Sequence, residues 1–180
     1  MPDKLSIAIV GSRGIPNRYG GFEELAEVLS LELVKKGHEL TVYTSSLHSD
    51  KSKSWNGVNR ILVPDPEDKL GTFGQFIYDL NANLNTRKKS YDIVLHLGYT
   101  SDSIWSFLWP SSSIHITNMD GMEWQRSKFS KAVRTFLKFA EKWAAKRSDY
   151  LVADSGAIEK FLNTKYKTPV RFIAYGAEIP

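Results

Sequence analysis

Residues 10–29 read VGSRGIPNRYGGFEELAEVL, and they join a strand-like run to a helix-like run. The preceding segment, 5–11, is short, apolar and rich in β-branched residues, as expected of a strand buried on both faces. From Phe22 onward apolar residues recur at helical spacing, and Gly37 is typical of the residue after a helix C-terminus. A strand, a glycine-rich turn and a helix in this order predict the first unit of a parallel α/β sheet.

The glycine-rich turn has the location of a phosphate site but not a familiar spacing. A helix N-terminus offers free N–H groups and the positive end of its dipole to an anion. Gly11 is followed by Gly14 and then by Gly20 and Gly21, whereas a dinucleotide fingerprint requires G-x-G-x-x-G and a P-loop requires G-K-[ST]. The second strand, LTVYTSS, also lacks the acidic residue that binds ribose in dinucleotide folds. Two interpretations remain open: a different anion-binding loop, or glycines that only build a long turn.

The rest of the chain repeats the same order of strand, loop and helix. Seven strands are expected, at residues 5–11, 38–45, 59–64, 91–98, 113–121, 149–155 and 170–176. Helices are expected at residues 21–36, 71–87, 127–147 and 156–165, with a short one within 101–110. The predicted fold is therefore α/β, a Rossmann-like parallel sheet of about seven strands with helices on both faces, in one domain spanning residues 1–180.

Composition excludes several classes of protein. The 180 residues are 42% hydrophobic and 24% charged, as in ordinary globular domains, and no apolar run approaches the roughly 20 residues of a membrane-spanning helix. The absence of cysteine excludes disulfides, thiol catalysis and cysteine–zinc sites, and a cytoplasmic location fits. The histidines have no metal-ligand spacing, so no metal site is expected. The net charge of +4 permits anionic partners, but the basic residues are spread out and nucleic-acid binding is not expected.

Several segments together resemble one enzyme family. They are GSRGIPNRYGGFEELAEVLSLELVKKGHELTVYT, HLGYTSD, NMDGMEWQRSKFS, AEKWAAKRSDYLVADSGAIEKFL and FIAYGAE. This combination is similar to the N-terminal, acceptor-side domain of GT-B glycosyltransferases of the retaining family 4, and more narrowly to the bacterial rhamnosyltransferases of polysaccharide synthesis. The resemblance covers nearly the whole chain except residues 47–90.

The resemblance implies a substrate class and a missing half. Such enzymes transfer a sugar from a nucleotide-sugar to a glycan or lipid-linked acceptor, with retention of the anomeric configuration, in polysaccharide or glycoconjugate synthesis. The donor implied here is dTDP-rhamnose, and no further cofactor is expected. In that family a C-terminal domain that binds most of the donor follows the segment resembled here. The donor domain is thus expected to be absent from this chain, and the chain alone is expected to be inactive. The location implied is cytoplasmic, at the inner face of the membrane.

The first glycine loop is assigned to the donor phosphates or the acceptor. Gly14, Arg18, Gly20 and Gly21 form this candidate site, in which the N–H groups around Gly20 and Gly21 face the diphosphate across the cleft. Arg18, together with Arg13, would add positive charge.

Asp120 is the candidate catalytic residue. It follows the fifth expected strand, at the edge where open α/β sheets bind ligands. In many members of the resembling family a histidine near this place touches the transferred sugar, and the rhamnosyl subgroup tends to have aspartate. Asp120 would hydrogen-bond sugar hydroxyls or stabilise positive charge at the anomeric carbon. Asp-Gly is also a common turn pair, so a purely structural role is the alternative.

Five further residues are assigned to the acceptor side of the cleft: His96, Gly98, Glu123, Trp124 and Arg126. Glu123 and Arg126 could bind acceptor hydroxyls or phosphate, or could only charge a helix start. His96 alternates with apolar neighbours in IVLHLGYT, which favours a buried, hydrogen-bonded histidine over a cleft position.

The expected helix 127–147 combines a basic face with apolar positions at helical spacing. Packing on the sheet accounts for this pattern, and peripheral contact with an anionic membrane is the alternative. Two other function classes also stay open. One is a nucleotide-binding oxidoreductase or epimerase domain, which the missing fingerprint disfavours, and the other is a non-enzymatic module that binds glycan or a membrane.

Overall fold

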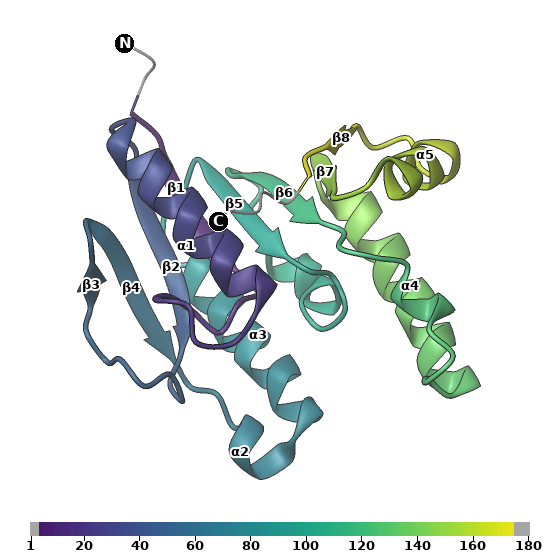
Figure 1. Ribbon diagram of the computed structural model, residues 1–180, viewed down its shortest axis with the longest axis horizontal. Coiled ribbons are helices and arrows are strands. Elements are labelled where there is room, and N and C mark those ends of the chain that lie inside the picture. The colour runs from purple at the N-terminus through teal and green to yellow at the C-terminus, as the bar shows by residue number, and fades with distance from the viewer. Residues whose placement is uncertain (1–3, 175–180) are drawn as a thin grey trace, which may run out of the picture.

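The computed structural model describes residues 4–174 and contains an eight-stranded sheet with helices on both faces (Figure 1). The strands are β1 (Ser6–Val10), β2 (Glu39–Ser45), β3 (Ser54–Trp55), β4 (Val58–Val63), β5 (Ile93–Leu97), β6 (Ile114–Asn118), β7 (Tyr150–Ala153) and β8 (Val170–Phe172). The α-helices are α1 (Gly21–Lys35), α2 (Glu67–Leu70), α3 (Thr72–Thr86), α4 (Lys131–Arg147) and α5 (Gly156–Lys165), and the 3-10 turns are η1 (Ser103–Leu108) and η2 (Glu123–Gln125). The predicted α/β class and mostly parallel sheet are confirmed.

The central strand β1 is buried on both faces, as its apolar run predicts. Ile7 and Ile9 pack with Ala26 of α1, whereas Ala8 and Val10 pack with residues of α3 on the opposite face. This alternation follows from the two-residue period of a strand. It places α1 and α3 on opposite faces of the sheet, as Figure 1 shows.

The strand order is β3-β4-β2-β1-β5-β6-β7-β8. After β1, the strands β2 and β4 lie on one side of it in the sheet. The connection that contains α3 then leads to β5 on the other side of β1, followed by β6, β7 and β8. The connections after β1 and after β5 therefore diverge at the carboxyl ends of two neighbouring strands. Such a switch point leaves a crevice, and open α/β sheets bind their ligands there.

The sheet contains one strand beyond the seven expected, β3, which lies between the expected strands 38–45 and 59–64. β3 pairs antiparallel with β4, with Trp55 opposite Val58, and the turn between them is Asn56-Gly57. Both turn residues have positive φ, at 45° and 84°, as the tight turn of a two-residue hairpin requires. Asn-Gly is the sequence pair that favours this turn, so the signal for the hairpin was present in the sequence.

The helix expected from residue 127 begins four residues later, at Lys131. Ser130 is its N-cap, and the Ser130 hydroxyl accepts the N–H of Val133 at 3.3 Å. A serine cap satisfies a backbone donor that has no partner within the helix, which defines the start of the helix. The last strand ends at Phe172 rather than at residue 176, and the end of that expected strand lies outside the described residues.

Candidate active site at the switch point

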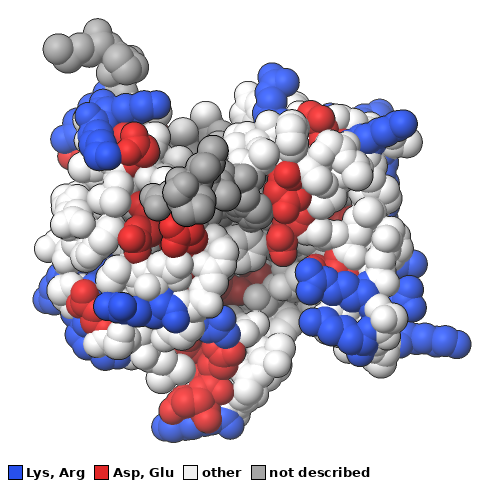
Figure 2. Space-filling view, viewed as in Figure 1, with Lys and Arg blue, Asp and Glu red and all other residues white. Residues whose placement is uncertain are grey.

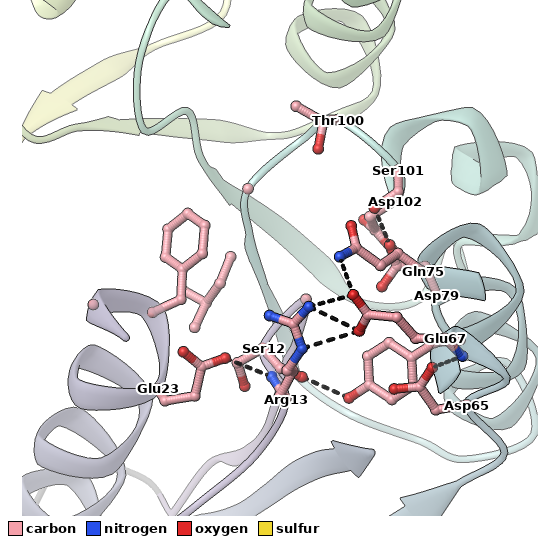
Figure 3. Close-up of a pocket in the computed structure, with 16 residues that line it drawn as sticks. Ser12, Arg13, Glu23, Asp65, Glu67, Gln75, Asp79, Thr100, Ser101 and Asp102 are labelled. Atoms are coloured by element: carbon pink, nitrogen blue, oxygen red, sulfur yellow. Dashed lines mark hydrogen bonds and ion pairs between the residues drawn. The ribbon is translucent and has the colours of Figure 1, made fainter. Parts of the chain in front are cut away.

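A pocket of about 240 Å³ lies at the carboxyl ends of β1 and β5 (Figure 3). Its walls come from the loops after β1, β4 and β5 and from the first turns of α1 and the body of α3. The lining residues are Gly11, Ser12, Arg13, Gly21, Phe22, Glu23, Asp65, Glu67, Gln75, Tyr78, Asp79, Leu97, Gly98, Thr100, Ser101 and Asp102. This is the place that the topology predicts for a ligand.

A second pocket, of about 180 Å³, adjoins the first. It is lined by Phe22, Gly98, Tyr99, Thr100, Asp120, Glu123 and Arg126. Three of these, Phe22, Gly98 and Thr100, also line the first pocket, so the two pockets lie side by side; together they are called here the switch-point crevice. Phe22 at the start of α1 and Asp120 in the loop after β6 line the same pocket.

Two of the loop glycines are required by close packing. Gly11 has φ of 84°, and a Cβ there would lie 2.4 Å from the carbonyl oxygen of Leu97 in β5. Gly14 has φ of 107°, and its Cβ would lie 2.4 Å from the side chain of Thr44 in β2. Gly14 is buried and does not line the crevice. Both glycines let the loop after β1 lie directly against the neighbouring strands.

The start of α1 is open to the crevice. Gly20 is the N-cap residue and is exposed, with an extended backbone, and no side chain caps the helix. Gly21 lines the first pocket, and a Cβ on it would meet nothing within 4 Å. Arg18 is exposed and lies outside the residues that line either pocket.

Arg13 does line the pocket, but a carboxylate already pairs with it (Figure 3). Its Nη2 lies 2.6 Å from Oε1 of Glu67, its Nε donates to Oε2 at 3.1 Å, and Gln75 donates to the same carboxylate at 2.8 Å. The hydrogen bond to Glu67 raises the pKa of Arg13 despite its partial burial. Burial alone would raise the pKa of Glu67, but the hydrogen bonds from Arg13 and Gln75 hold that pKa below its ordinary value. The pair is therefore ionised, and the guanidinium charge is matched within the wall.

Other carboxyl groups line the same pocket. Glu23, Asp65, Asp79 and Asp102 are each at most 7% exposed. Burial, followed by the charge of Asp102, raises the pKa of Asp79 well above its ordinary value. Asp79 also accepts the hydroxyl of Ser101 at 2.5 Å. Burial thus favours the neutral form of Asp79, and carboxyl groups dominate the inner wall of the pocket.

His96 lies behind this wall, fully buried, and contacts the pocket only through Asp102. Its Nδ1 lies 2.7 Å from Oδ2 of Asp102 and its Nε2 lies 3.0 Å from Nδ1 of His115, whose Nε2 lies 2.9 Å from the carbonyl oxygen of Pro110. The ring of His96 stacks on Trp109 with 3.9 Å between centroids. A carbonyl oxygen only accepts, so Nε2 of His115 carries a proton. Burial lowers the pKa of His115, which favours the neutral ring. Nδ1 of the neutral ring is unprotonated and accepts from Nε2 of His96.

Asp120 borders the outer part of the crevice. It has φ of 47°, which is uncommon for a residue other than glycine, and its N–H donates to the Asn118 side chain at 3.0 Å. Burial, followed by the charge of Asp154, raises the pKa of Asp120. Glu123 and Arg126 form an ion pair of 2.7 Å beside it, and burial raises the pKa of Glu123 while Arg126 opposes that shift.

Trp124 does not line either pocket but fixes the adjacent turn η2 to α4 and α5. Its Nε1 donates to Glu141 at 2.7 Å, and its carbonyl accepts from Arg134 at 2.7 Å. The ammonium groups of Lys138 and Lys165 lie 4.9 Å and 5.6 Å from its ring centroid. The ring therefore supports the segment that carries Glu123 and Arg126.

Sequence reasoning missed most of the carboxylates of the inner pocket. Asp65 follows β4, and Ser101 with Asp102 follows β5, so their position at strand ends was a usable signal. Asp79 lies within α3, and only the packing of that helix against β1 brings it to the pocket.

Among residues 4–174, no group of His, Cys, Asp or Glu is placed to hold a metal ion. No helix within that range is long and apolar enough to cross a bilayer.

An open, mostly parallel sheet with a switch point at its carboxyl edge defines a Rossmann-like α/β domain. The same fold occurs in the solved structure of apo UGT2 from Phytolacca americana, a plant UDP-glycosyltransferase with the GT-B fold, at a TM-score of 0.61 and 9% sequence identity. The match covers 97% of this chain and 52% of that one, so the chain spans about half the length of the plant protein. By sequence, the chain belongs to the family described as Domain of unknown function (DUF1972), which matches residues 4–178. No curated protein matches the chain in sequence.

Proposed function

We propose that this chain is the acceptor-side domain of a nucleotide-sugar-dependent glycosyltransferase, and that the sugar is transferred in the switch-point crevice. One observation carries the proposal. Gly21, at the start of α1, and Asp120, after β6, lie 99 positions apart in the sequence but border two adjoining pockets at the carboxyl edge of the sheet. The fold shared with half of a plant UDP-glycosyltransferase supports this assignment.

Each end of the crevice has a role in the proposed transfer. The N–H groups at the uncapped start of α1, around Gly20 and Gly21, face the departing diphosphate. The carboxylate of Asp120 hydrogen-bonds sugar hydroxyls or stabilises positive charge as it develops at the anomeric carbon. Asp120 acts in its ionised form, so the raised pKa predicts that the rate falls as the pH is lowered through it.

In its finer form, the proposal names the reaction implied by the sequence resemblance. The enzyme transfers a deoxyhexose, rhamnose from dTDP-rhamnose, with retention to a glycan or lipid-linked acceptor in bacterial polysaccharide or glycoconjugate synthesis, at the cytoplasmic face of the membrane. A second, donor-binding domain supplies the opposite wall of the crevice, and no other cofactor takes part. The family-level motifs around residues 10–29 and 118–130 support this form.

A transfer assay tests the proposed function. The 180 residues alone are expected to transfer no sugar from dTDP-rhamnose to a glycan acceptor, whereas a protein that joins them to a donor-binding domain is expected to do so, with mass spectrometry detecting the product. NMR of the new glycosidic bond then reports retention or inversion. Transfer by the 180 residues alone would refute the proposal that a second, donor-binding domain is required. Calorimetric binding of NAD in place of the dTDP-sugar would instead support an oxidoreductase or epimerase domain.

Peripheral membrane contact is a second proposal, and the exposed face of α4 favours it. Phe139 and Trp143, one turn apart, are 55% and 47% exposed. Lys142 and Lys146 lie on the same exposed stretch of the helix. Figure 2 shows blue side chains gathered over the region of α4. Exposed aromatic rings among lysines match the requirements of binding to an anionic bilayer surface.

A further inference from the structure

A concavity outside the switch-point crevice lies between α4 and the end of α5. Its volume is about 480 Å³, and its lining residues are Thr135, Lys138, Phe139, Lys142, Lys165 and Tyr166. Three of these six are lysines, and they come from two different helices. The lining, all of it in the described part of the chain, contains no Asp or Glu and shares no residue with the crevice. The proposed transfer therefore leaves this basic concavity without a function.

One of the three lysines is already matched by a carboxylate and held in place. Nζ of Lys165 lies 2.6 Å from Oε1 of the buried Glu141. The same ammonium group lies 4.9 Å from the ring centroid of Phe161 and 5.2 Å from that of Tyr166. Glu141 also accepts the Tyr166 hydroxyl at Oε1 and the Trp124 indole N–H at Oε2, each at 2.7 Å. Glu141 thus cancels the charge of Lys165, and both of its oxygens are in use.

The other two lysines carry charge that the described chain does not match. Lys138 and Lys142 lie one turn apart on α4, and both are exposed. Among residues 4–174, neither forms an ion pair with a carboxylate. Like charges four residues apart on a helix repel each other and destabilise it. The Lys138 ammonium group is placed over the Trp124 ring, 4.9 Å from its centroid. The concavity therefore has two unmatched positive charges beside each other.

Two neighbouring ammonium groups suit an oxyanion with two negative charges. A phosphate monoester carries a charge of about −1.5 to −2 near pH 7 and has three strong acceptor oxygens. A phosphate diester or a carboxylate carries one negative charge, so either would leave one ammonium group unmatched. Lysine binds phosphate as a point charge, without the fixed fork geometry of arginine. The volume of about 480 Å³ also leaves room for the group that carries the phosphate.

We propose that the concavity between α4 and α5 is a binding site for a phosphate monoester, in which Lys138 and Lys142 pair with the phosphate oxygens. Lys165, fixed by Glu141, forms the opposite wall. The site lies outside the crevice and goes beyond the proposed function, so sugar transfer and phosphate binding are tested independently. The phosphate belongs either to a soluble phosphorylated molecule or to the monoester headgroup of a lipid.

Two soluble probes that differ in charge test the site: glycerol 3-phosphate, a monoester, and dimethyl phosphate, a diester. Each is titrated into the 180-residue chain at low salt, and the indole N–H signals of the tryptophans are followed by NMR. The signal of Trp124 is expected to shift, because its ring lies beneath the Lys138 ammonium group. The signal of Trp105, whose indole donates to the carbonyl of Phe76, is expected to stay unchanged. The monoester is expected to bind at least about fivefold more tightly than the diester.

Lys142→Gln is the test variant, and Lys146→Gln is its matched control. Lys146 is an exposed lysine one turn further along α4 that does not line the concavity. Lys142→Gln is expected to weaken glycerol 3-phosphate by about tenfold, because it removes one of the two unmatched charges, whereas Lys146→Gln is expected to stay within about twofold. Both positions are exposed, so thermal unfolding of both variants is expected to match that of the unaltered protein. Equal weakening by the two variants, equal affinity for the diester, or no shift at Trp124 would overturn the inference.

Vesicles distinguish the two sources of the phosphate. Phosphatidylcholine vesicles are prepared with phosphatidic acid, which has a monoester headgroup, or with the same fraction of phosphatidylglycerol, a diester. Sedimentation with phosphatidic acid vesicles that falls in Lys142→Gln but not in Lys146→Gln would assign the site to a lipid headgroup. Binding of glycerol 3-phosphate without a preference for phosphatidic acid vesicles would assign the same site to a soluble phosphate. A preference for phosphatidic acid that both variants reduce equally would replace the site with a diffuse basic face and overturn the inference.

Discussion

The replacement Glu141→Gln offers a quantitative test of how the outer wall of the crevice is held. Glu141 in α4 is 1% exposed and its carboxylate accepts three donors. Oε2 accepts Nε1–H of Trp124 at 2.7 Å, while Oε1 accepts from Lys165 at 2.6 Å and from the Tyr166 hydroxyl at 2.7 Å. Because Trp124 belongs to η2, this one carboxylate ties the turn that carries Glu123 to two helices.

A glutamine at this position has nearly the same shape but accepts at only one oxygen. If the amide NH₂ faces the indole, the buried Trp124 N–H is left without an acceptor; if it faces the other way, Lys165 and the Tyr166 hydroxyl lose the carboxylate oxygen that accepts from both. Such a loss costs roughly 1–3 kcal/mol, and hydrogen bonds to a charged group are worth about 1.5–3 kcal/mol. The ion pair with Lys165 adds little because that side chain is 39% exposed. The expected loss of unfolding free energy is about 2–4 kcal/mol.

Urea unfolding followed by tryptophan fluorescence measures this loss. For a chain of this length each kcal/mol corresponds to roughly 2–4 °C in Tm, so the melting temperature is expected to fall by about 4–16 °C. Glu32→Gln is the matched control, because Glu32 makes an exposed i,i+3 pair with Lys35 and no measurable change is expected. A Glu141→Gln variant within about 0.5 kcal/mol of the unaltered protein would refute the reasoning that this carboxylate anchors η2.

The remaining predictions concern the loop, the outer crevice and the surface of α4. Gly14→Ala is expected to lower the unfolding free energy by about 2–3 kcal/mol, measured in urea, since positive φ and the side chain of Thr44 both oppose a Cβ. Asp120→Asn, which tolerates the same positive φ, is expected to lower kcat of sugar transfer by about 10²–10³-fold and to remove the acidic limb of the pH–rate profile; an unchanged rate would exclude a catalytic role. The double variant Phe139→Ser, Trp143→Ser is expected to lose sedimentation with anionic liposomes, and binding that does not depend on anionic lipid would end the membrane proposal.

The sequence predicted the central half of the fold because its signals are local. The run 5–11 is apolar at every inward position of β1, and the following helix shows its own period, so strand, turn and helix could be assigned without tertiary information. The hairpin β3 was missed although Asn56-Gly57 marks it, because strands of two residues have too few positions to show a period of two. The start of α4 at Lys131 depends on which of several serines acts as the cap, and Ser127 and Ser130 are both plausible from sequence.

The candidate site was only partly predictable, for a physical reason. Asp120 and Gly98 follow strand ends, so the rule for ligand sites in α/β sheets finds them, and both border the crevice. Asp79 is an ordinary helical position in sequence and reaches the pocket only because α3 packs across β1. Asp102 lies between His96 and the crevice. The sequence pattern of β5 alone does not show which side chain covers His96.

The geometry also separates the functions of the four glycines in the loop after β1. Gly11 and Gly14 are required by close contact with β5 and β2, so they shape the loop, whereas Gly20 and Gly21 leave the start of α1 open. The nearest cation, Arg13, is already paired with Glu67, and Arg18 is exposed outside the crevice. A bound diphosphate would therefore find backbone N–H groups here but no unpaired guanidinium in the lining of either pocket. Since a diphosphate is stabilised chiefly by cations and helix N-termini, the proposed function requires that most of its positive partners come from the donor-binding domain. Under the proposed function, the acidic inner pocket therefore belongs to the acceptor side of the enzyme, and the donor diphosphate relies on the other domain.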